Sequence, residues 1–209
     1  MDDYMVFAFI RHGLTVENEK GKYIGWTNSG LSSSGIEVLN AQKKLFKNYE
    51  RCYSSDLNRC LETAKFIFPH TPLFSSPLLR ELHFGEWEGL TYEILKDDRM
   101  YQEWLSDPFS SPPGGEGMIQ FRKRVDVAWK QIKAHIDEVK GNRYAVITHG
   151  GVIRHLLTSL SPGNEQRTFW DWEVNHGAGF ELVWKTEENW RDQECTLLQA
   201  VPLMESQDG

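Results

Sequence analysis

Two short, mostly apolar segments stand out in the pattern of hydrophobic and polar positions, Val6–Ile10 and Tyr144–Thr148. Segments of this length with continuous apolar character are typical of strands that are buried on both faces of a sheet. Each segment leads to a histidine followed by a glycine, in Arg11-His12-Gly13 and in His149-Gly150-Gly151. The pattern therefore predicts two central strands that both end at polar side chains.

Apolar residues at helical spacing predict the helices, and shorter apolar patches predict the remaining strands. Helices are expected from serine N-caps at Ser32–Ser34 to about Phe46, from an N-cap at Asp56 to Phe68, in a short part of Thr91–Leu105, over Gly117–Lys140 and over Val152–Leu160. Strands are expected at Arg51–Ser54, at Leu73-Phe74 on a sheet edge, and around Phe180–Trp184 and Thr196–Val201. This order indicates an α/β fold, a three-layer α/β/α sandwich with a mostly parallel central sheet.

A chain of 209 residues is long enough for one sizeable core, so we expect residues 1–209 to form a single domain. Between residues 107 and 117, three prolines and three glycines make the longest predicted loop. Long loops in compact domains often carry function. We therefore expect residues 90–117 to be an insertion that lies over the active site.

The formal charge of −7 argues against a nucleic-acid partner and against an anionic membrane surface, since both favour a basic face. It leaves open a small anionic substrate, which responds to the local field of a pocket. No apolar run approaches the ~18 residues of a membrane span, and the acidic start at Met1 lacks the layout of a signal peptide. Cys52 and Cys60 lie in apolar-periodic segments, which favours buried, reduced thiols and a cytoplasmic location. The oligomeric state is left open.

The ends of the two central strands are the candidate site. In an open α/β sheet, side chains that follow the carboxyl ends of neighbouring strands meet at one edge, where ligands bind. His12 and His149 would then lie together, Arg11 would add positive charge, and the backbone N–H groups of Gly150-Gly151 would favour an anion. A zinc site is the alternative, because imidazoles bind metals readily. It is disfavoured because metal-ligand spacings are missing and Arg11 would repel a cation.

Five ordered motifs resemble the signatures of the histidine phosphatase superfamily, the phosphoglycerate mutase-like group. They span residues 6 to about 155 and are Arg11-His12-Gly13 with Thr15 and Asn18; Gly25-Trp26 with Leu31-Ser32-x-x-Gly35; Ser54-Ser55-Asp56-Leu57-Asn58-Arg59-Cys60-Leu61-Glu62-Thr63-Ala64; Glu81-Leu82-His83-Phe84-Gly85-x-Trp87-x-Gly89; and Thr148-His149-Gly150-Gly151.

The resemblance implies roles for these residues and a phosphoglycerate mutase-like fold. His12 would be the nucleophile that forms a phosphohistidine, and Glu81 would donate a proton to the leaving oxygen. The resemblance assigns the phosphoryl oxygens to Arg11, Arg59 and His149, and the lining of the phosphate site to Thr15, Asn18, Gly25 and Gly150. It implies neither a metal nor a cofactor.

Without the motifs, Arg59 would be interpreted as a solvated arginine on a helix face, and Glu81 as a surface carboxylate with Glu86 and Glu88 as competitors. His83, His155 and His176 are interpreted as structural, with His176-Gly177 near the rim of the pocket.

Within the resemblance, a phosphatase that hydrolyses a small phosphorylated metabolite is favoured over a phosphoglycerate mutase. The mutases of this family have a longer insertion after the acid residue and a longer C-terminal tail, whereas here the segment from Gly89 to Gly114 is short. The motifs around Phe84 and Glu116 resemble the α-ribazole phosphatase branch, which acts on a nucleotide-like precursor of cobalamin. Mutase-type phosphotransfer is the alternative. A non-catalytic phosphate-binding protein is the third hypothesis.

Overall fold

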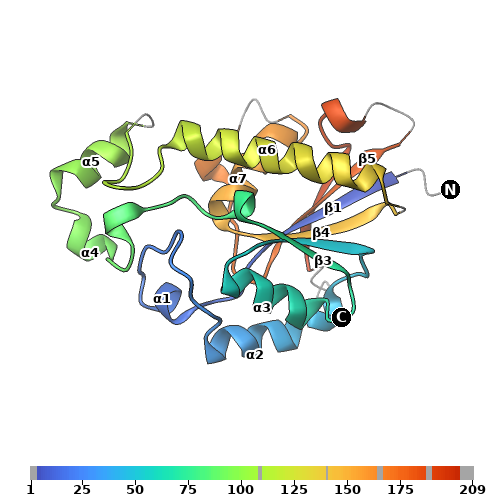
Figure 1. Cartoon of the computed structure of the whole chain (residues 1–209), viewed down its shortest axis with the longest axis horizontal. Helices are drawn as coiled ribbons and strands as arrows, with labels where there is room; N and C mark the ends of the chain where they lie inside the picture. The colour runs from blue at the N-terminus through green and yellow to red at the C-terminus, as the bar shows by residue number, and fades with distance from the viewer. Residues whose placement is uncertain (1–3, 108–109, 140, 164–166, 187–189, 203–209) are drawn as a thin grey trace, which may run out of the picture.

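The central element of the computed structural model is a six-stranded sheet in the order β3-β2-β4-β1-β5-β6. The structure describes residues 4–107, 110–139, 141–163, 167–186 and 190–202. The strands are β1 (Tyr4–Arg11), β2 (Arg51–Ser55), β3 (Leu73–Ser76), β4 (Arg143–Thr148), β5 (Gly179–Lys185) and β6 (Leu197–Val201). Figure 1 shows β1 and β4 in the middle of the sheet, as their continuous apolar character predicts.

Most neighbouring strands run parallel. β1 pairs with β4, β4 with β2, and β2 with β3 in parallel, while β5 is antiparallel to both β1 and β6. The expected edge strand at Leu73-Phe74 and the antiparallel pairing of the tail are thus confirmed. Arg11 is the register partner of Thr148, so β1 and β4 end at the same level of the sheet. This register brings the residues after the two strands together.

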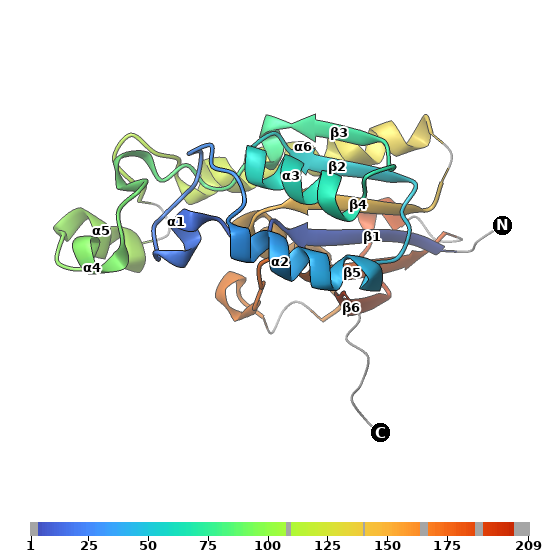
Figure 2. The same cartoon turned by 90° about the horizontal axis from the view of Figure 1, so that it is seen from below.

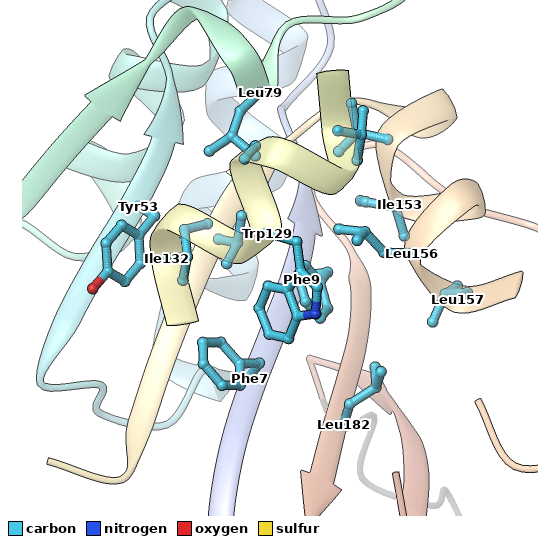
Figure 3. Close-up of a cluster of buried hydrophobic side chains, with 14 of the residues drawn as sticks. Phe7, Phe9, Tyr53, Leu79, Trp129, Ile132, Ile153, Leu156, Leu157 and Leu182 are labelled. Atoms are coloured by element: carbon cyan, nitrogen blue, oxygen red, sulfur yellow. The ribbon is translucent and has the colours of Figure 1, made fainter. Parts of the chain in front are cut away.

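Helices cover both faces of the sheet, which confirms the three-layer sandwich (Figures 1 and 2). α2 (Ser33–Gln42) and α3 (Asn58–Ile67) pack on one face, and α6 (Met118–Asp137) and α7 (Gly150–Leu160) pack on the other. β1 divides its side chains between the two cores: Phe7 and Phe9 join the core under α6 and α7, while Ala8 and Ile10 join the core under α2 and α3. Figure 3 shows the rings of Phe7 and Phe9 against Trp129 of α6.

A smaller group of helices lies beyond the carboxyl ends of the parallel strands. It consists of α1 (Val16–Glu19), α4 (Tyr92–Leu95) and α5 (Arg99–Ser106), at the left of Figure 2. Trp87, Leu95 and Tyr101 form a separate apolar cluster there. The 3₁₀ turns within the described residues are Lys43–Leu45, Pro77–Leu79, Gly85–Trp87, Phe169–Asp171 and Trp190–Asp192. Part of the predicted loop at 107–117 falls outside the described residues.

Several predicted helix ends differ from the structure: α7 begins at Gly150 rather than Val152, and α6 ends at Asp137 rather than Lys140. Two further differences have a clear cause. Asp56 is not the N-cap of α3: that position is Leu57, which makes no side-chain cap. The Asp56 carboxylate instead accepts two hydrogen bonds from the Arg80 guanidinium, at 2.7 and 2.6 Å. A bidentate ion pair satisfies the carboxylate better than a single backbone N–H would. α2 ends at Gln42 rather than Phe46 because the chain tightens into a 3₁₀ turn at Lys43–Leu45. The N-cap of α2 is Ser32, as predicted.

Within the described residues, no helix is both long enough and apolar enough to cross a bilayer.

Candidate active site

The histidines that follow β1 and β4 lie side by side. The ring centroids of His12 and His149 are 5.1 Å apart, and the two side chains are 3% and 1% exposed. The backbone N–H of His12 donates to the carbonyl of Thr148 at 2.9 Å, which extends the pairing of the strands by one residue. The two strand ends thus meet as the sequence predicts.

His12 is held as a neutral imidazole. Its Nδ1 lies 2.7 Å from the carbonyl oxygen of Gly13, which can only accept, so we assign the ring proton to Nδ1. Nε2 then keeps its lone pair. Burial lowers the pKa of His12 well below its usual range, and the electrostatic interactions with His149, Arg59 and Arg11 lower it further.

Two guanidinium groups lie close to this imidazole, that of the buried Arg59 and that of the partly buried Arg11. Arg59, in the first turn of α3, is fully buried and donates to the carbonyl oxygens of Thr27 and Gly25, each at 2.7 Å. Arg11 donates to the carbonyl of Val174 at 2.7 Å. In each guanidinium the buried Nε has no partner among the described residues. Burial lowers the pKa of Arg59 and lowers that of Arg11 to about 10. The solvated helix-face alternative for Arg59 is therefore wrong.

His149 joins Arg59 to the start of α7. Its Nδ1 lies 3.3 Å from Nη2 of Arg59, and its Nε2 lies 2.9 Å from the hydroxyl of Ser55. The guanidinium can only donate, so Nδ1 is the acceptor and Nε2 carries the proton. Burial and the Arg59 charge lower the pKa of His149 well below its usual range. Gly150 and Gly151 follow as the first residues of α7, where free backbone N–H groups favour an anion.

Glu81 is anchored at the same helix end. Its Oε2 accepts the N–H of Gly151 at 2.9 Å, and its Oε1 accepts the N–H of Leu82 at 2.9 Å. The competing carboxylates are used elsewhere or lie in solvent. Glu88 accepts the N–H groups of Trp26 and Thr27, at 2.7 and 2.5 Å, and Glu86 is exposed. Of the three carboxylates considered in the sequence, Glu81 is the one that the structure brings to the start of α7.

The other predicted lining residues have local structural partners. Gly25 allows the backbone to approach closely, since a Cβ there would lie 2.0 Å from the carbonyl oxygen of Leu82. Thr15 is buried and caps α1. Asn18 Oδ1 accepts from the N–H and the hydroxyl of Thr15, at 3.3 and 3.1 Å. These bonds fix the loop after His12, while a direct contact of Thr15 or Asn18 with phosphate stays a prediction.

A third imidazole, which the sequence analysis placed near the rim of the pocket and interpreted as structural, lies against His12. The ring centroid of His176 lies 5.1 Å from that of His12, and its Nδ1 lies 3.2 Å from the carbonyl oxygen of His12. Burial lowers the pKa of His176 to about 4, with a contribution from Arg11. The following N–H, of Gly177, donates to the carbonyls of Arg11 and His12. The signal was present, because His176-Gly177 is a further His-Gly pair in the sequence.

Arg124 of α6 supports the segment that carries Glu81. It donates to the carbonyl oxygens of Leu78, Arg80 and Glu81 and to the carboxylate of Glu116. Arg124 belongs to the motif around Glu116 that resembles the α-ribazole phosphatase branch. The motif does not reveal this supporting role, since most of the partners of Arg124 are backbone atoms of an irregular segment. Among the described residues, no group of three or more histidine, cysteine, aspartate or glutamate side chains is placed to hold a metal ion.

An apolar pocket opens beside Glu81 and the start of α7. Its inner part, about 70 Å³, is lined by Glu81, Leu82, Phe84, Trp104, Met118, Phe121, Gly151, Arg154, Phe169 and Trp170. Its outer part, about 280 Å³, is lined by Trp104, Leu105, Ser106, Met118, Arg122, Phe169 and Trp170. The two parts share Trp104, Met118, Phe169 and Trp170. We call the whole the side pocket.

Comparison with known proteins places these features in a family context. The family model for the histidine phosphatase superfamily (branch 1) matches residues 7–194. The chain is 32% identical to phosphoglycerate mutase-like protein 4 of Arabidopsis thaliana, over 77% of this chain and 73% of the relative. It is 30% identical to putative phosphoserine phosphatase 2 of Hydrogenobacter thermophilus, over 86% and 90%. The α-ribazole phosphatase structure from Shigella flexneri superposes with a TM-score of 0.75 at 25% identity, over 85% of this chain and 90% of that one.

Proposed function

Because the chain belongs to the histidine phosphatase superfamily, we propose that it is a metal-independent phosphomonoesterase that works through a phosphohistidine on His12. The observation that carries the proposal is a neutral imidazole close to two arginines. His12 directs its proton to the carbonyl of Gly13, which leaves Nε2 as the nucleophile. Arg11 and Arg59 each keep a buried Nε–H donor without a partner among the described residues.

In the first step, Nε2 of His12 attacks the phosphorus, and the bond from phosphorus to the ester oxygen breaks. Glu81, in its protonated form, gives its proton to the departing oxygen, so the alcohol leaves neutral. The transferring phosphoryl group spreads its charge over three oxygens, which suits fixed guanidinium groups and the N–H of Gly150. His149 accepts from Arg59 and directs its ring N–H to Ser55, so its part in this step is to hold the Arg59 guanidinium in place.

In the second step, water attacks the phosphorus of the phosphohistidine and the bond from nitrogen to phosphorus breaks. Glu81, now ionised, takes a proton from that water and returns to its starting form. Phosphate leaves, and His12 is again neutral. The proton that Glu81 gives up in the first step is replaced in the second, and neither step requires a metal ion or a cofactor.

The substrate class is a small phosphorylated metabolite, with α-ribazole 5'-phosphate as the first candidate. The name of the Shigella structure supports this choice; the name of the Arabidopsis relative supports mutase-type phosphotransfer as the alternative.

We further propose one domain over residues 1–209, with 90–117 inserted over the site, as the position of Trp104 in the side pocket suggests. The buried free thiols Cys52, Cys60 and Cys195 are consistent with a reducing, cytoplasmic location.

The first test is turnover of p-nitrophenyl phosphate. We expect activity that EDTA leaves intact and vanadate abolishes, and a loss of at least ~10³-fold in His12→Ala, because the variant has no nucleophile. The exposed His70 provides a matched control, so His70→Ala should retain full activity. Substantial activity in His12→Ala would end the phosphohistidine mechanism, and loss of activity in EDTA would point to a metallohydrolase.

The same preparation separates the alternative functions. A phosphatase releases inorganic phosphate from 3-phosphoglycerate or from α-ribazole 5'-phosphate. A mutase, given 2,3-bisphosphoglycerate and 3-phosphoglycerate, produces 2-phosphoglycerate. A phosphate-binding protein binds these esters and releases nothing.

A further inference from the structure

The side pocket begins at the residue proposed as the proton donor. Glu81 and Gly151, which are joined by a hydrogen bond of 2.9 Å, both line its inner part. A phosphate held between Arg11, Arg59 and His12 would direct its ester oxygen towards Glu81. The group attached to that oxygen would then enter the side pocket. This argument rests on the proposed function, because it takes Glu81 as the proton donor.

Aromatic side chains from separate parts of the chain make the walls of the side pocket. Trp104 comes from α5, and its ring lies 6.1 Å from that of Phe84 in an edge-on arrangement. Phe169 and Trp170 come from the 3₁₀ turn before β5, and their rings lie 4.9 Å apart at 83°. Met118, the first residue of α6, lies between these elements in both parts of the pocket. Such walls suit a flat, apolar group.

Trp170 has the largest exposed fraction, 69%, among the large apolar side chains of the described chain. Burial therefore contributes little to holding it in place. Its turn is nevertheless well fixed, because the N–H and the hydroxyl of Thr168 both donate to Asp171 Oδ2, at 2.6 and 2.8 Å. The turn thus presents an exposed indole at the mouth of the pocket, where a second ring can stack on it.

The outer part of the side pocket offers few partners to a polar leaving group. The outer part has Arg122 as its charged lining residue, with the guanidinium 5.8 Å from the centre of the Phe169 ring, and no carboxylate. The ammonium group of a phosphoserine would find no counter-ion in that part. A small hydroxylated group such as that of a glycerol phosphate would lose water without gaining hydrogen bonds from the apolar walls.

We propose that the side pocket makes the protein selective for phosphomonoesters whose alcohol carries an aromatic ring, with Trp170 as the specificity-determining residue. The ring enters between Trp104 and Met118 on one side and Phe169 and Trp170 on the other. The volume of the outer part, about 280 Å³, is close to the ~300 Å³ at the lower end of small-molecule sites. Arg122 at the mouth favours the electron-rich face of such a ring.

The test compares 2-phenylethyl phosphate with n-propyl phosphate. Both release a primary alcohol, so their demands on the proton donor are matched and only the ring differs. We expect kcat/KM to favour the phenyl ester by roughly 10- to 100-fold. In Trp170→Ala this preference should fall at least ~5-fold, because kcat/KM falls more for the phenyl ester than for the propyl ester. Phe74→Ala removes a half-exposed ring that lies on β3, outside the side pocket, and should leave the preference intact.

A binding experiment distinguishes failure of this proposal from failure of the proposed function. Calorimetry with 3-phenylpropylphosphonate and n-butylphosphonate, which lack the scissile bond, measures affinity for the side pocket without any turnover. Tighter binding of the phenyl compound that is lost in Trp170→Ala supports the aromatic pocket, even if no ester is hydrolysed, and absent hydrolysis would refute the phosphatase alone. Equal affinities for the two phosphonates, or a preference that survives in Trp170→Ala, would overturn the aromatic pocket.

Discussion

At the residue scale, the site depends on keeping particular side chains in one protonation state. His12 must be neutral to act as a nucleophile, and it lies between cations that would repel a proton. Burial and these cations lower its pKa well below the usual range, so the neutral form persists at neutral pH. Glu81 is different, because it must give a proton and later take one back. Its side chain is partly exposed, and its two oxygens accept from the backbone N–H groups of Leu82 and Gly151.

The proposed role of Glu81 makes the effect of Glu81→Gln depend on the leaving group. The amide keeps the size of the side chain and can still accept the N–H of Gly151, but it cannot protonate an alkoxide. We expect kcat/KM for n-propyl phosphate to fall by ~10²–10⁴-fold. For p-nitrophenyl phosphate the loss should stay below ~10-fold, because p-nitrophenolate leaves without a proton.

Glu86→Gln is the matched control, since Glu86 is an exposed carboxylate of the same segment. It should leave both rates unchanged. Equal losses for the alkyl and the aryl ester in Glu81→Gln would contradict a role as general acid.

At the scale of elements, the start of α7 organises the site. The helix follows β4 without a connecting loop, with His149 as its N-cap residue and Gly150 and Gly151 in its first turn. Gly151 is needed for space rather than for backbone freedom, since a Cβ there would lie 2.2 Å from Glu81 Oε1. The strand end, the helix N-terminus and the carboxylate therefore form one rigid unit. This explains why a glycine pair rather than a single glycine follows His149.

Gly151→Ala should push Glu81 away from the start of α7. A displacement of about 1 Å in a catalytic group costs on the order of 10²-fold in rate. We expect kcat/KM for n-propyl phosphate to fall by ~10–100-fold, with a smaller loss for p-nitrophenyl phosphate, as in Glu81→Gln. Thermal unfolding checks that the variant is folded.

Gly117→Ala is the control for a new methyl group at a helix start, because its Cβ would meet only the side chain of Ser111, at 3.7 Å. It should retain the wild-type rates. Wild-type rates in Gly151→Ala would show that Glu81 tolerates the methyl group and that the docking of Glu81 is not required.

At the scale of the whole molecule, a buried carboxylate joins several parts of the fold at the end of the sheet where β1 begins. Glu181 of β5 is 1% exposed and accepts from Lys47 at 3.0 Å and from Tyr49 at 3.3 Å. It also contacts Arg143 at the start of β4 and Gln199 of β6. Burial by itself would raise the pKa of Glu181, but the hydrogen bond from Lys47 and the charge of Arg143 outweigh it and lower the pKa.

A lowered pKa predicts how stability depends on pH. The contribution of Glu181 should be complete above the unfolded-state pKa of ~4.3, and it should be lost as the pH falls through the lower pKa of the folded state. Glu181→Gln leaves Lys47 and Arg143 without their partner. We expect it to reduce the free energy of unfolding by about 2–3 kcal/mol at pH 7. The difference from wild type should shrink below pH 4. Urea unfolding at several pH values measures this.

Glu93→Gln removes an exposed carboxylate that pairs with Lys96, so it should change the free energy of unfolding by less than ~1 kcal/mol. A Glu181→Gln effect that is as small as this, or that does not vary with pH, would contradict the role given to the buried cluster.

Most of the fold followed from local sequence patterns. Continuous apolar segments such as Val6–Ile10 identify central strands because only a strand covered on both faces buries every side chain. The same pattern placed His12 and His149 at one edge, since parallel strands end on the same side. Helix ends were less predictable. Asp56, for example, could either cap α3 or pair with Arg80, and it pairs with Arg80. Local sequence carries no information about that distant partner.

The residue types at the site, and the sheet that brings the strand ends together, follow from local sequence patterns. The environments of those residues depend on contacts between distant parts of the fold. Arg59 is a buried donor rather than a solvated one because the carbonyls of Gly25 and Thr27 fold over it. His176 meets His12 because β5 pairs with β1, a contact between residues 164 positions apart. The side pocket likewise exists only where α5, α6 and the turn at Phe169 converge. The burial, charge and shape of the site depend on contacts between residues that are far apart in the sequence, and local sequence patterns do not reveal such contacts.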